Sequence, residues 1–171
     1  MKGYVQLYTG DGKGKTTAAF GLALRATGAG KKVFFAQFVK GKRYSETEAV
    51  EQMIPGITIR QFGRDCFIVK TPEKEDIEAA RNGLKEVEKI IRSGNYDIVI
   101  LDEACIAIYY RLFTEEELIG ILDNRPEGTE IVITGRYATP GLIGYADLVT
   151  EMKEVKHYYQ QGVKARKGIE Y

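Results

Sequence analysis

The stretch YVQLYTGDGKGKTTAAFG, residues 4–21, decides the fold because it passes directly from one kind of secondary structure to another. Its first part alternates polar and apolar residues, as a half-buried β-strand does. Its middle carries glycines at positions 10, 12 and 14, which indicates a turn. From Thr16 it becomes apolar and alanine-rich, which predicts a helix. A strand, a glycine-rich turn and a helix therefore follow one another.

This order predicts an anion site. Backbone N–H groups of the turn and the positive end of the helix surround one point. Lys15 adds a charge for phosphate oxygens, and the Thr16 hydroxyl can ligate a magnesium ion. Of the pattern G-x-x-x-x-G-K-[ST], the last three positions match and the first glycine is Thr9. A purely structural turn is the alternative. The predicted nucleotide-binding residues are Thr9, Gly10, Asp11, Gly12, Lys13, Gly14, Lys15, Thr16 and Thr17.

The rest of the chain alternates extended apolar runs with helical patterns. Strands are expected within residues 4–9, 32–40, 57–62, 97–104, 129–136 and 147–155, and helices within 16–28, 72–94 and 114–124. This alternation predicts an α/β fold: a mainly parallel sheet covered by helices on both faces, with the P-loop NTPase (RecA-like) architecture. We expect a single P-loop domain over residues 1–171, with a C-terminal tail from 156 to 171 that shows no clear period.

Two strand ends supply further polar candidates. Asp102 and Glu103 follow the run DIVIL, and Arg136 follows the run EIVITG. The carboxyl ends of parallel strands meet at the edge where ligands of open α/β sheets bind. Together with Thr16, the two carboxylates are predicted ligands of Mg²⁺ or Mn²⁺, because such ions prefer oxygen donors. A solvated acidic turn is the alternative. Arg136 offers a guanidinium fork to phosphate oxygens.

Composition excludes several classes of protein. The chain has 25 basic and 24 acidic side chains and a net charge of +1, so bulk charge predicts no binding to nucleic acid. Its single histidine, His157, and its two distant cysteines, Cys66 and Cys105, give neither a usual zinc site nor a Ser-His-Asp triad. We read both cysteines as incidental thiols. No run suits a membrane span or a signal peptide, so we expect a cytoplasmic protein.

These residues predict a site for a nucleoside triphosphate without fixing its reaction. Glu103 beside a metal carboxylate could orient a water, as in RecA-type ATPases. A kinase for a small metabolite is a further alternative.

Four segments resemble the CobA/BtuR family of corrinoid adenosyltransferases. They are TGDGKGKTTAAFGLALRATGAGKKVFFAQFVKG (9–41), VILDEA (99–104), VITGRYA (132–138) and EVKHYYQQGVKARKGIEY (154–171). The resemblance spans nearly the whole chain, and the family shares Thr9 at the start of the loop. Where the family usually has asparagine, this chain has Asp11.

The resemblance implies a reaction between ATP and a corrinoid. Cobalt reduced to Co(I) attacks the 5′ carbon of ATP, which lies reversed in the loop, and tripolyphosphate leaves. It assigns catalytic roles to Lys15 and Arg136, which would stabilise the leaving group. It also implies that Phe67, in the segment QFGRDCFIVKTP (61–72), displaces the lower cobalt ligand. An electron donor such as a flavoprotein reductase and a homodimeric assembly are further implications.

Overall fold

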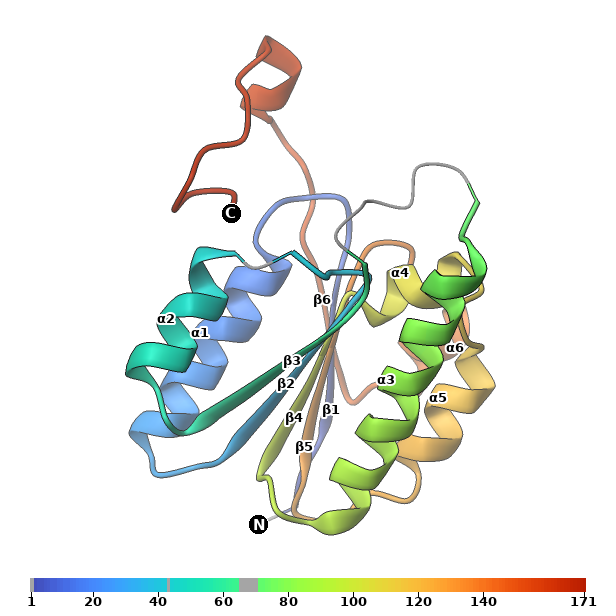
Figure 1. The fold of residues 1–171 in the computed structure, drawn as a ribbon. Helices are drawn as coiled ribbons and strands as arrows, with labels where there is room; N and C mark the ends of the chain where they lie inside the picture. Colours follow the sequence, from blue (N-terminus) through green and yellow to red (C-terminus); the bar gives the residue numbers. More distant parts are fainter. Residues whose placement is uncertain (1, 43, 65–70) are drawn as a thin grey trace.

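A computed structural model describes residues 2–42, 44–64 and 71–171 of the chain. Its centre is a six-stranded sheet in which every strand pairing is parallel (Figure 1). The strand order is β3-β2-β4-β5-β1-β6. The strands are β1 (Val5–Thr9), β2 (Val33–Phe38), β3 (Ile57–Phe62), β4 (Ile98–Asp102), β5 (Glu130–Thr134) and β6 (Leu148–Glu151). The predicted mainly parallel sheet and all six predicted strands are confirmed.

Helices cover both faces of this sheet. In Figure 1, α1 and α2 lie on one face, and α3, α5 and α6 lie on the other. The helices are α1 (Lys15–Gly28), α2 (Ser45–Met53), α3 (Lys74–Ser93), α4 (Ala104–Tyr109), α5 (Glu115–Leu122) and α6 (Pro140–Tyr145), and a 3₁₀ turn spans Tyr158–Gln161. Among the described residues, none of these helices has the length and apolar character that a membrane span needs.

Each face of the sheet has its own hydrophobic core. Neighbouring residues of a strand point to opposite faces, so Phe34 packs in the core beneath α3 and α5, whereas Phe35 packs in the core beneath α1. Every residue of β2 and of β4 is buried, which explains why these runs are almost continuously apolar in sequence. The two cores hold the strands in place, and the candidate site residues lie at the carboxyl ends of these strands.

The helix boundaries confirm some sequence signals and correct others. In the sequence, Thr114 and Glu117 have the spacing of a capping box; the two residues do form one at the start of α5, and Gly94 ends α3 with a φ of 64°. Thr71 followed by Pro72 predicts a helix start in the sequence, but α3 does not start there. The helix begins at Lys74, where the carboxylates of Glu73 and Asp76 form the capping box. The short helices α2, α4 and α6 were not predicted.

The strand order positions the site. β5 lies between β1 and β4, and all three run in the same direction. The glycine-rich loop after β1, the carboxylates after β4 and Arg136 after β5 therefore lie at one edge of the sheet. The α/β fold is thus consistent with the predicted P-loop NTPase architecture.

Candidate active site

The glycine-rich loop joins β1 to α1, and two of its glycines adopt positive φ angles. These are Gly10, with φ 94°, and Gly14, with φ 121°, a region that side chains rarely tolerate. Space is short as well, because a Cβ on Gly10 or Gly12 would lie 2.5 or 2.7 Å from the carbonyl oxygen of Met152. The segment that follows β6 therefore packs against the loop and requires glycine there.

Thr9 replaces the first glycine of the usual pattern without strain. It is the last residue of β1 and pairs with Glu151 of β6. Its carbonyl oxygen accepts a hydrogen bond from the Met152 N–H at 2.8 Å, and its side chain is buried. The chain turns only at the next residue, so position 9 remains extended and can hold threonine.

Lys15 folds over the loop that precedes it. Its Nζ donates to the carbonyl oxygens of Gly10 and Gly12 at 2.6 and 2.7 Å, and only 8% of the residue is exposed. Burial lowers the pKa of this ammonium, although Glu103 and other acidic neighbours oppose the shift. The carbonyl partners hold the lysine at the centre of the loop, within reach of an anion bound by the loop N–H groups.

Asp102 is the most completely enclosed acid of the site. It is fully buried at the end of β4, and four side chains donate to its carboxylate. These donors are Thr16 at 2.8 Å, Thr134 at 2.7 Å, Gln37 at 3.3 Å and Lys40 at 2.8 Å. A buried carboxylate costs much free energy unless it is paired, and this one has both a counter-charge and hydrogen bonds.

Glu103 lies beside Asp102 in a strained backbone conformation. Its φ is 59°, and its N–H donates to the Thr134 hydroxyl at 3.0 Å. Its buried Oε2 atom has no hydrogen-bond partner among the described residues. Burial, and next the charge of Asp102, raises the pKa of Glu103. An acid of this kind, strained and left without a donor, is typical of a group that awaits a ligand.

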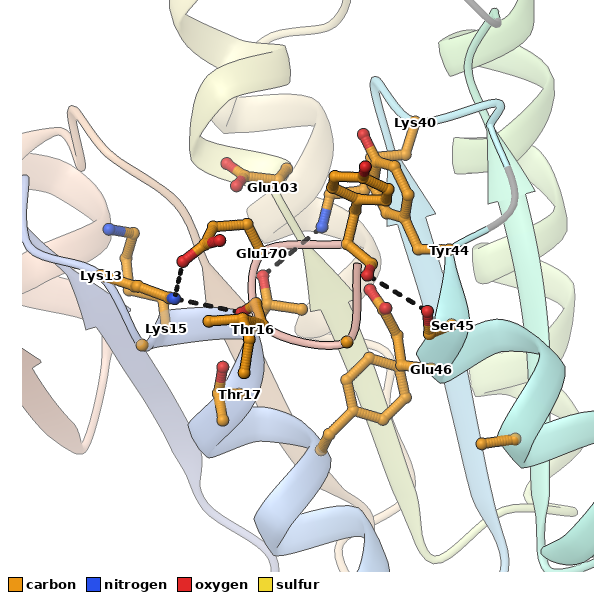
Figure 2. Close-up of a pocket in the computed structure, with 16 residues that line it drawn as sticks. Lys13, Lys15, Thr16, Thr17, Lys40, Tyr44, Ser45, Glu46, Glu103 and Glu170 are labelled. Carbon is orange, nitrogen blue, oxygen red and sulfur yellow. Dashed lines mark hydrogen bonds and ion pairs between the residues drawn. The ribbon is translucent and has the colours of Figure 1, made fainter. Parts of the chain in front are cut away.

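Lys40 belongs to this cluster, although the sequence did not identify it. Its Nζ lies 2.8 Å from Asp102 Oδ2 and 3.5 Å from the Thr16 hydroxyl (Figure 2). Burial alone would lower the pKa of Lys40, but the charge of Asp102, its hydrogen bond and the charge of Glu103 together raise it. The only signal in the sequence is its place two residues after β2, the neighbour of β4.

The remaining predicted residues lie around this centre. Thr17 and Lys13 line the cavity beside the loop, whereas Asp11 is exposed and does not. Arg136 is exposed, and its guanidinium lies over the ring of Tyr137 at 5.7 Å. Its positive charge helps to lower the pKa of Lys15 and of Glu103, but, like Asp11, it is not among the residues that line the cavity.

The C-terminal tail, residues 156–171, covers the site next to the glycine-rich loop. The sequence did not indicate this position of the tail. In Figure 1 it returns across the sheet edge to the glycine-rich loop. Lys13 Nζ donates to Glu170 at 2.8 Å, to the Tyr158 hydroxyl at 3.0 Å and to the Ile169 carbonyl at 3.1 Å. Ser45 of α2 donates to the Tyr171 carbonyl oxygen at 3.1 Å. The loop, α2 and the tail thereby enclose a cavity of about 710 Å³ (Figure 2).

The residues present supply part of the oxygen ligand set that a divalent metal needs, and phosphate oxygens and water would complete it. No group of three or more His, Cys, Asp or Glu residues that could hold an ion occurs in the part of the chain that the structure describes. The structure does offer the Thr16 hydroxyl, the Asp102 carboxylate and the unpartnered Oε2 of Glu103. Magnesium is held in this way, by one or two carboxylates, substrate phosphates and water.

Two predicted residues, Cys66 and Phe67, lie outside the described residues. Cys105 is a buried free cysteine, as expected of an incidental thiol. Burial, and next the charge of Glu103, raises its pKa to about 12, which leaves it protonated.

The parallel sheet, the glycine-rich loop with its lysine and threonine, and the adjacent carboxylate strand define a P-loop nucleotide-binding protein. A family model described as ATP:corrinoid adenosyltransferase BtuR/CobO/CobP matches residues 1–171. The chain belongs to this family, and the recognition made from the four segments is confirmed.

Curated relatives agree with this assignment. A corrinoid adenosyltransferase of Escherichia coli K12 is 36% identical, over 99% of this chain and 86% of the relative. The corrinoid adenosyltransferase CobA of Salmonella typhimurium is 35% identical over the same shares. A corrinoid adenosyltransferase of Pseudomonas aeruginosa is 34% identical, over 99% of this chain and 84% of the relative. The family is one of transferases whose substrates are ATP and a corrinoid.

Proposed function

We propose that this protein transfers the 5′-deoxyadenosyl group of ATP to the Co(I) centre of a corrinoid and releases tripolyphosphate. The electron pair of the cobalt substrate forms the Co–C bond, and the bond from C5′ to oxygen breaks with its electron pair on the triphosphate. The observation that carries the proposal is the glycine-rich loop, Gly10–Thr16, with its buried Lys15 beside a cavity of about 710 Å³, in a chain that matches the family over residues 1–171.

The reaction asks for orientation and charge stabilisation rather than for an activated protein nucleophile. Co(I) is itself the nucleophile, so no serine, cysteine or histidine has to be deprotonated. The loop N–H groups and the Lys15 ammonium would bind the leaving triphosphate, whose negative charge grows as the bond breaks. The exposed Arg136 would add charge from the end of β5.

Thr16, Asp102 and Glu103 would hold a Mg²⁺ or Mn²⁺ ion at the triphosphate. When bound, the ion would neutralise part of the charge on the leaving group. The contribution of the chain itself is to hold Asp102 in place through Thr134 and Gln37, and to keep Glu103 Oε2 free of protein donors among the described residues.

Phe67 is our candidate for the residue that displaces the lower cobalt ligand and eases reduction to Co(I). Phe67→Ala should slow adenosylation that starts from Co(II), and leave adenosylation of chemically reduced Co(I) much less affected. Equal loss from both starting states, with a lower melting temperature, would instead indicate a packing role.

The wider setting is proposed on the family resemblance. An electron donor such as a flavoprotein reductase would supply Co(I), the protein would act in the cytoplasm as a homodimer, and residues 1–171 would form one domain with the tail 156–171.

Product analysis tests the reaction. ATP is incubated with and without a chemically reduced corrinoid, and the products are separated by ion-exchange chromatography. We expect adenosylcorrinoid and tripolyphosphate in equal amounts, and little phosphate release without corrinoid. Hydrolysis to ADP and phosphate by the protein alone, abolished by Glu103→Gln, would instead support a RecA-type ATPase. Phosphorylation of an added metabolite would support the kinase alternative.

A further inference from the structure

Lys40 occupies the place that a bridging cation would take between two predicted metal ligands. Thr16 Oγ1 donates to Asp102 Oδ1 at 2.8 Å, so the hydroxyl and the carboxylate already touch. The Lys40 ammonium lies 2.8 Å from the other oxygen of this carboxylate and 3.5 Å from the hydroxyl. One positive charge therefore contacts both groups, as Figure 2 shows for Lys40 and Thr16.

The backbone around Lys40 is built to deliver this side chain. Val39 has a φ of 52°, an outlier for a β-branched residue, and it turns the chain at the end of β2. A Cβ on Gly63 would lie 2.4 Å from the backbone nitrogen of Lys40, and a Cβ on Gly41 would lie 2.4 Å from the carbonyl carbon of Arg64. A strained valine and two obligatory glycines thus hold residues 39–41 against the end of β3. A surface lysine would require none of them.

The Lys40 head group also faces the cavity. Its side chain is 18% exposed, and it lines the same cavity as Lys13, Lys15 and Glu103. The four-carbon side chain of a lysine is flexible, so the ammonium of Lys40 can leave the carboxylate while the Lys40 backbone stays fixed. The nearest new partner on the cavity side would be an anion bound at the loop.

We propose that Lys40 is a cation placeholder that becomes a catalytic residue: its ammonium holds the position between Thr16 and Asp102 in the free enzyme, and moves to the triphosphate when a metal–triphosphate complex binds. In the free enzyme it neutralises the buried carboxylate. In the complex Lys40 would leave Asp102, whose charge an ion held by Thr16 and Asp102 would balance, and its ammonium would add one more positive charge to the leaving group. The proposal rests on the metal–triphosphate site of the proposed function.

The proposal predicts opposite effects on two ligands when the ammonium is removed. Lys40→Met keeps the length of the stem and deletes the charge. Mn²⁺ alone should bind the variant about tenfold more tightly, because the competing cation is gone, which free-ion electron paramagnetic resonance measures. Tripolyphosphate with saturating Mg²⁺ should bind about tenfold more weakly in calorimetry, because a charge-assisted hydrogen bond is lost.

A matched control uses Lys31, which also pairs closely with an aspartate beside the sheet. Lys31 Nζ lies 3.0 Å from Asp97, ahead of β2 and β4 rather than at their carboxyl ends. Lys31→Met should leave both affinities unchanged. Lys40→Arg should restore the tripolyphosphate affinity at least in part, and a thermal melt of every variant identifies any that does not fold. If Lys40→Met unfolds, Lys40→Gln takes its place.

The outcomes separate the proposal from its alternatives. Tighter Mn²⁺ binding with unchanged tripolyphosphate binding would make Lys40 a counter-charge only, and would overturn its catalytic half. Unchanged Mn²⁺ binding would overturn the placeholder half. If the unmodified protein does not bind Mg²⁺ and tripolyphosphate, the proposed function and the catalytic half both fail, while the Mn²⁺ measurement still decides the placeholder half.

Discussion

The glycine-rich loop and the C-terminal tail enclose the same cavity, yet different forces hold them. The loop, Gly10–Thr16, is fixed by the backbone of Met152 and by a fully buried carboxylate, Asp102. The tail, residues 156–171, is exposed along most of its length and is attached through the Lys13–Glu170 ion pair and through hydrogen bonds that Lys13 and Ser45 donate to it. Buried and exposed contacts differ severalfold in strength, so we expect the loop and Asp102 to be rigid and the tail to be able to open.

Asp102→Ala should have the largest effect of the predicted changes, because it removes the buried contacts that hold the glycine-rich loop. It leaves the Lys40 ammonium largely buried without its carboxylate and removes the acceptor of three further donors. We expect the free energy of unfolding to fall by about 3–5 kcal/mol, measured by urea denaturation. Asp97→Ala breaks an exposed lysine–aspartate pair of similar length and also removes the acceptor of the Lys32 N–H, so it should cost about 1–2 kcal/mol. Equal losses would contradict the contrast between buried and exposed contacts.

Lys15→Ala should reduce activity without a comparable loss of stability. The ammonium donates two hydrogen bonds in the loop, and burial already lowers its pKa, so its removal relieves a desolvated charge. Charge-assisted hydrogen bonds are worth about 1.5–3 kcal/mol each, so kcat/KM should fall by about ten- to a hundredfold or more. Steady-state adenosylation and a thermal melt measure the two effects. Near-normal turnover would remove the role of the loop in phosphate binding.

The glycine-rich loop and Asp102 could be predicted from the sequence because the residues that identify them are neighbours in the chain. The glycines, Lys15 and Thr16 are neighbours in the chain, and the apolar run before Asp102 identifies a buried strand. Parallel pairing then brings these segments to one edge of the sheet. The fold and most of the candidate site were therefore predictable.

The role of Lys40 and the position of the tail over the site escaped prediction because both depend on partners that are distant in the sequence. Lys40 reaches Asp102 only because β2 pairs with β4 and because Val39 adopts a positive φ, which no residue pattern reveals. Glu170 meets Lys13 across nearly the whole length of the chain. The helices α2, α4 and α6 were missed because they are short and provide few periods of a helical pattern.

Glu170→Gln should weaken the attachment of the tail and leave the glycine-rich loop and Asp102 unchanged. The carboxylate accepts hydrogen bonds from Lys13, Tyr158 and Arg166, two of which carry a positive charge. Limited trypsin digestion at the exposed basic residues of the tail should become about two- to fivefold faster, the range of a weakened exposed ion pair. The melting temperature should hardly change. Glu154→Gln serves as the control: it removes a charge near the tail, keeps the Glu170 contacts, and leaves an amide oxygen that can still accept the hydrogen bond from Gln160.

The smallest effect we predict is the pH dependence of tail closure. Hydrogen bonds from Arg166, Lys13 and Tyr158 lower the pKa of Glu170 well below its usual range. Arg166 and Tyr158 belong to the tail, so of these three contacts only the one with Lys13 is lost when the tail opens, and the pKa of Glu170 is then higher than in the closed state. A carboxyl whose pKa is lower in the closed state stabilises closure above the pKa of the open state. This stabilisation is lost as the pH falls through the closed-state value. The tail should thus stay closed at neutral and mildly acidic pH, and open only in stronger acid.

The Arg166 amide can report this titration, because its N–H donates to Glu170 at 2.8 Å. Its ¹⁵N and ¹H chemical shifts, followed by NMR from neutral to acidic pH, should change with a midpoint well below about 4.3, the value of an unperturbed glutamate. Lys13→Met removes one of the three donors and should move this midpoint upward. A midpoint already at the unperturbed value in the unmodified protein would mean that the carboxylate is not held. The tail would then be open in solution, and the cavity would be bounded by the loop and α2 without it.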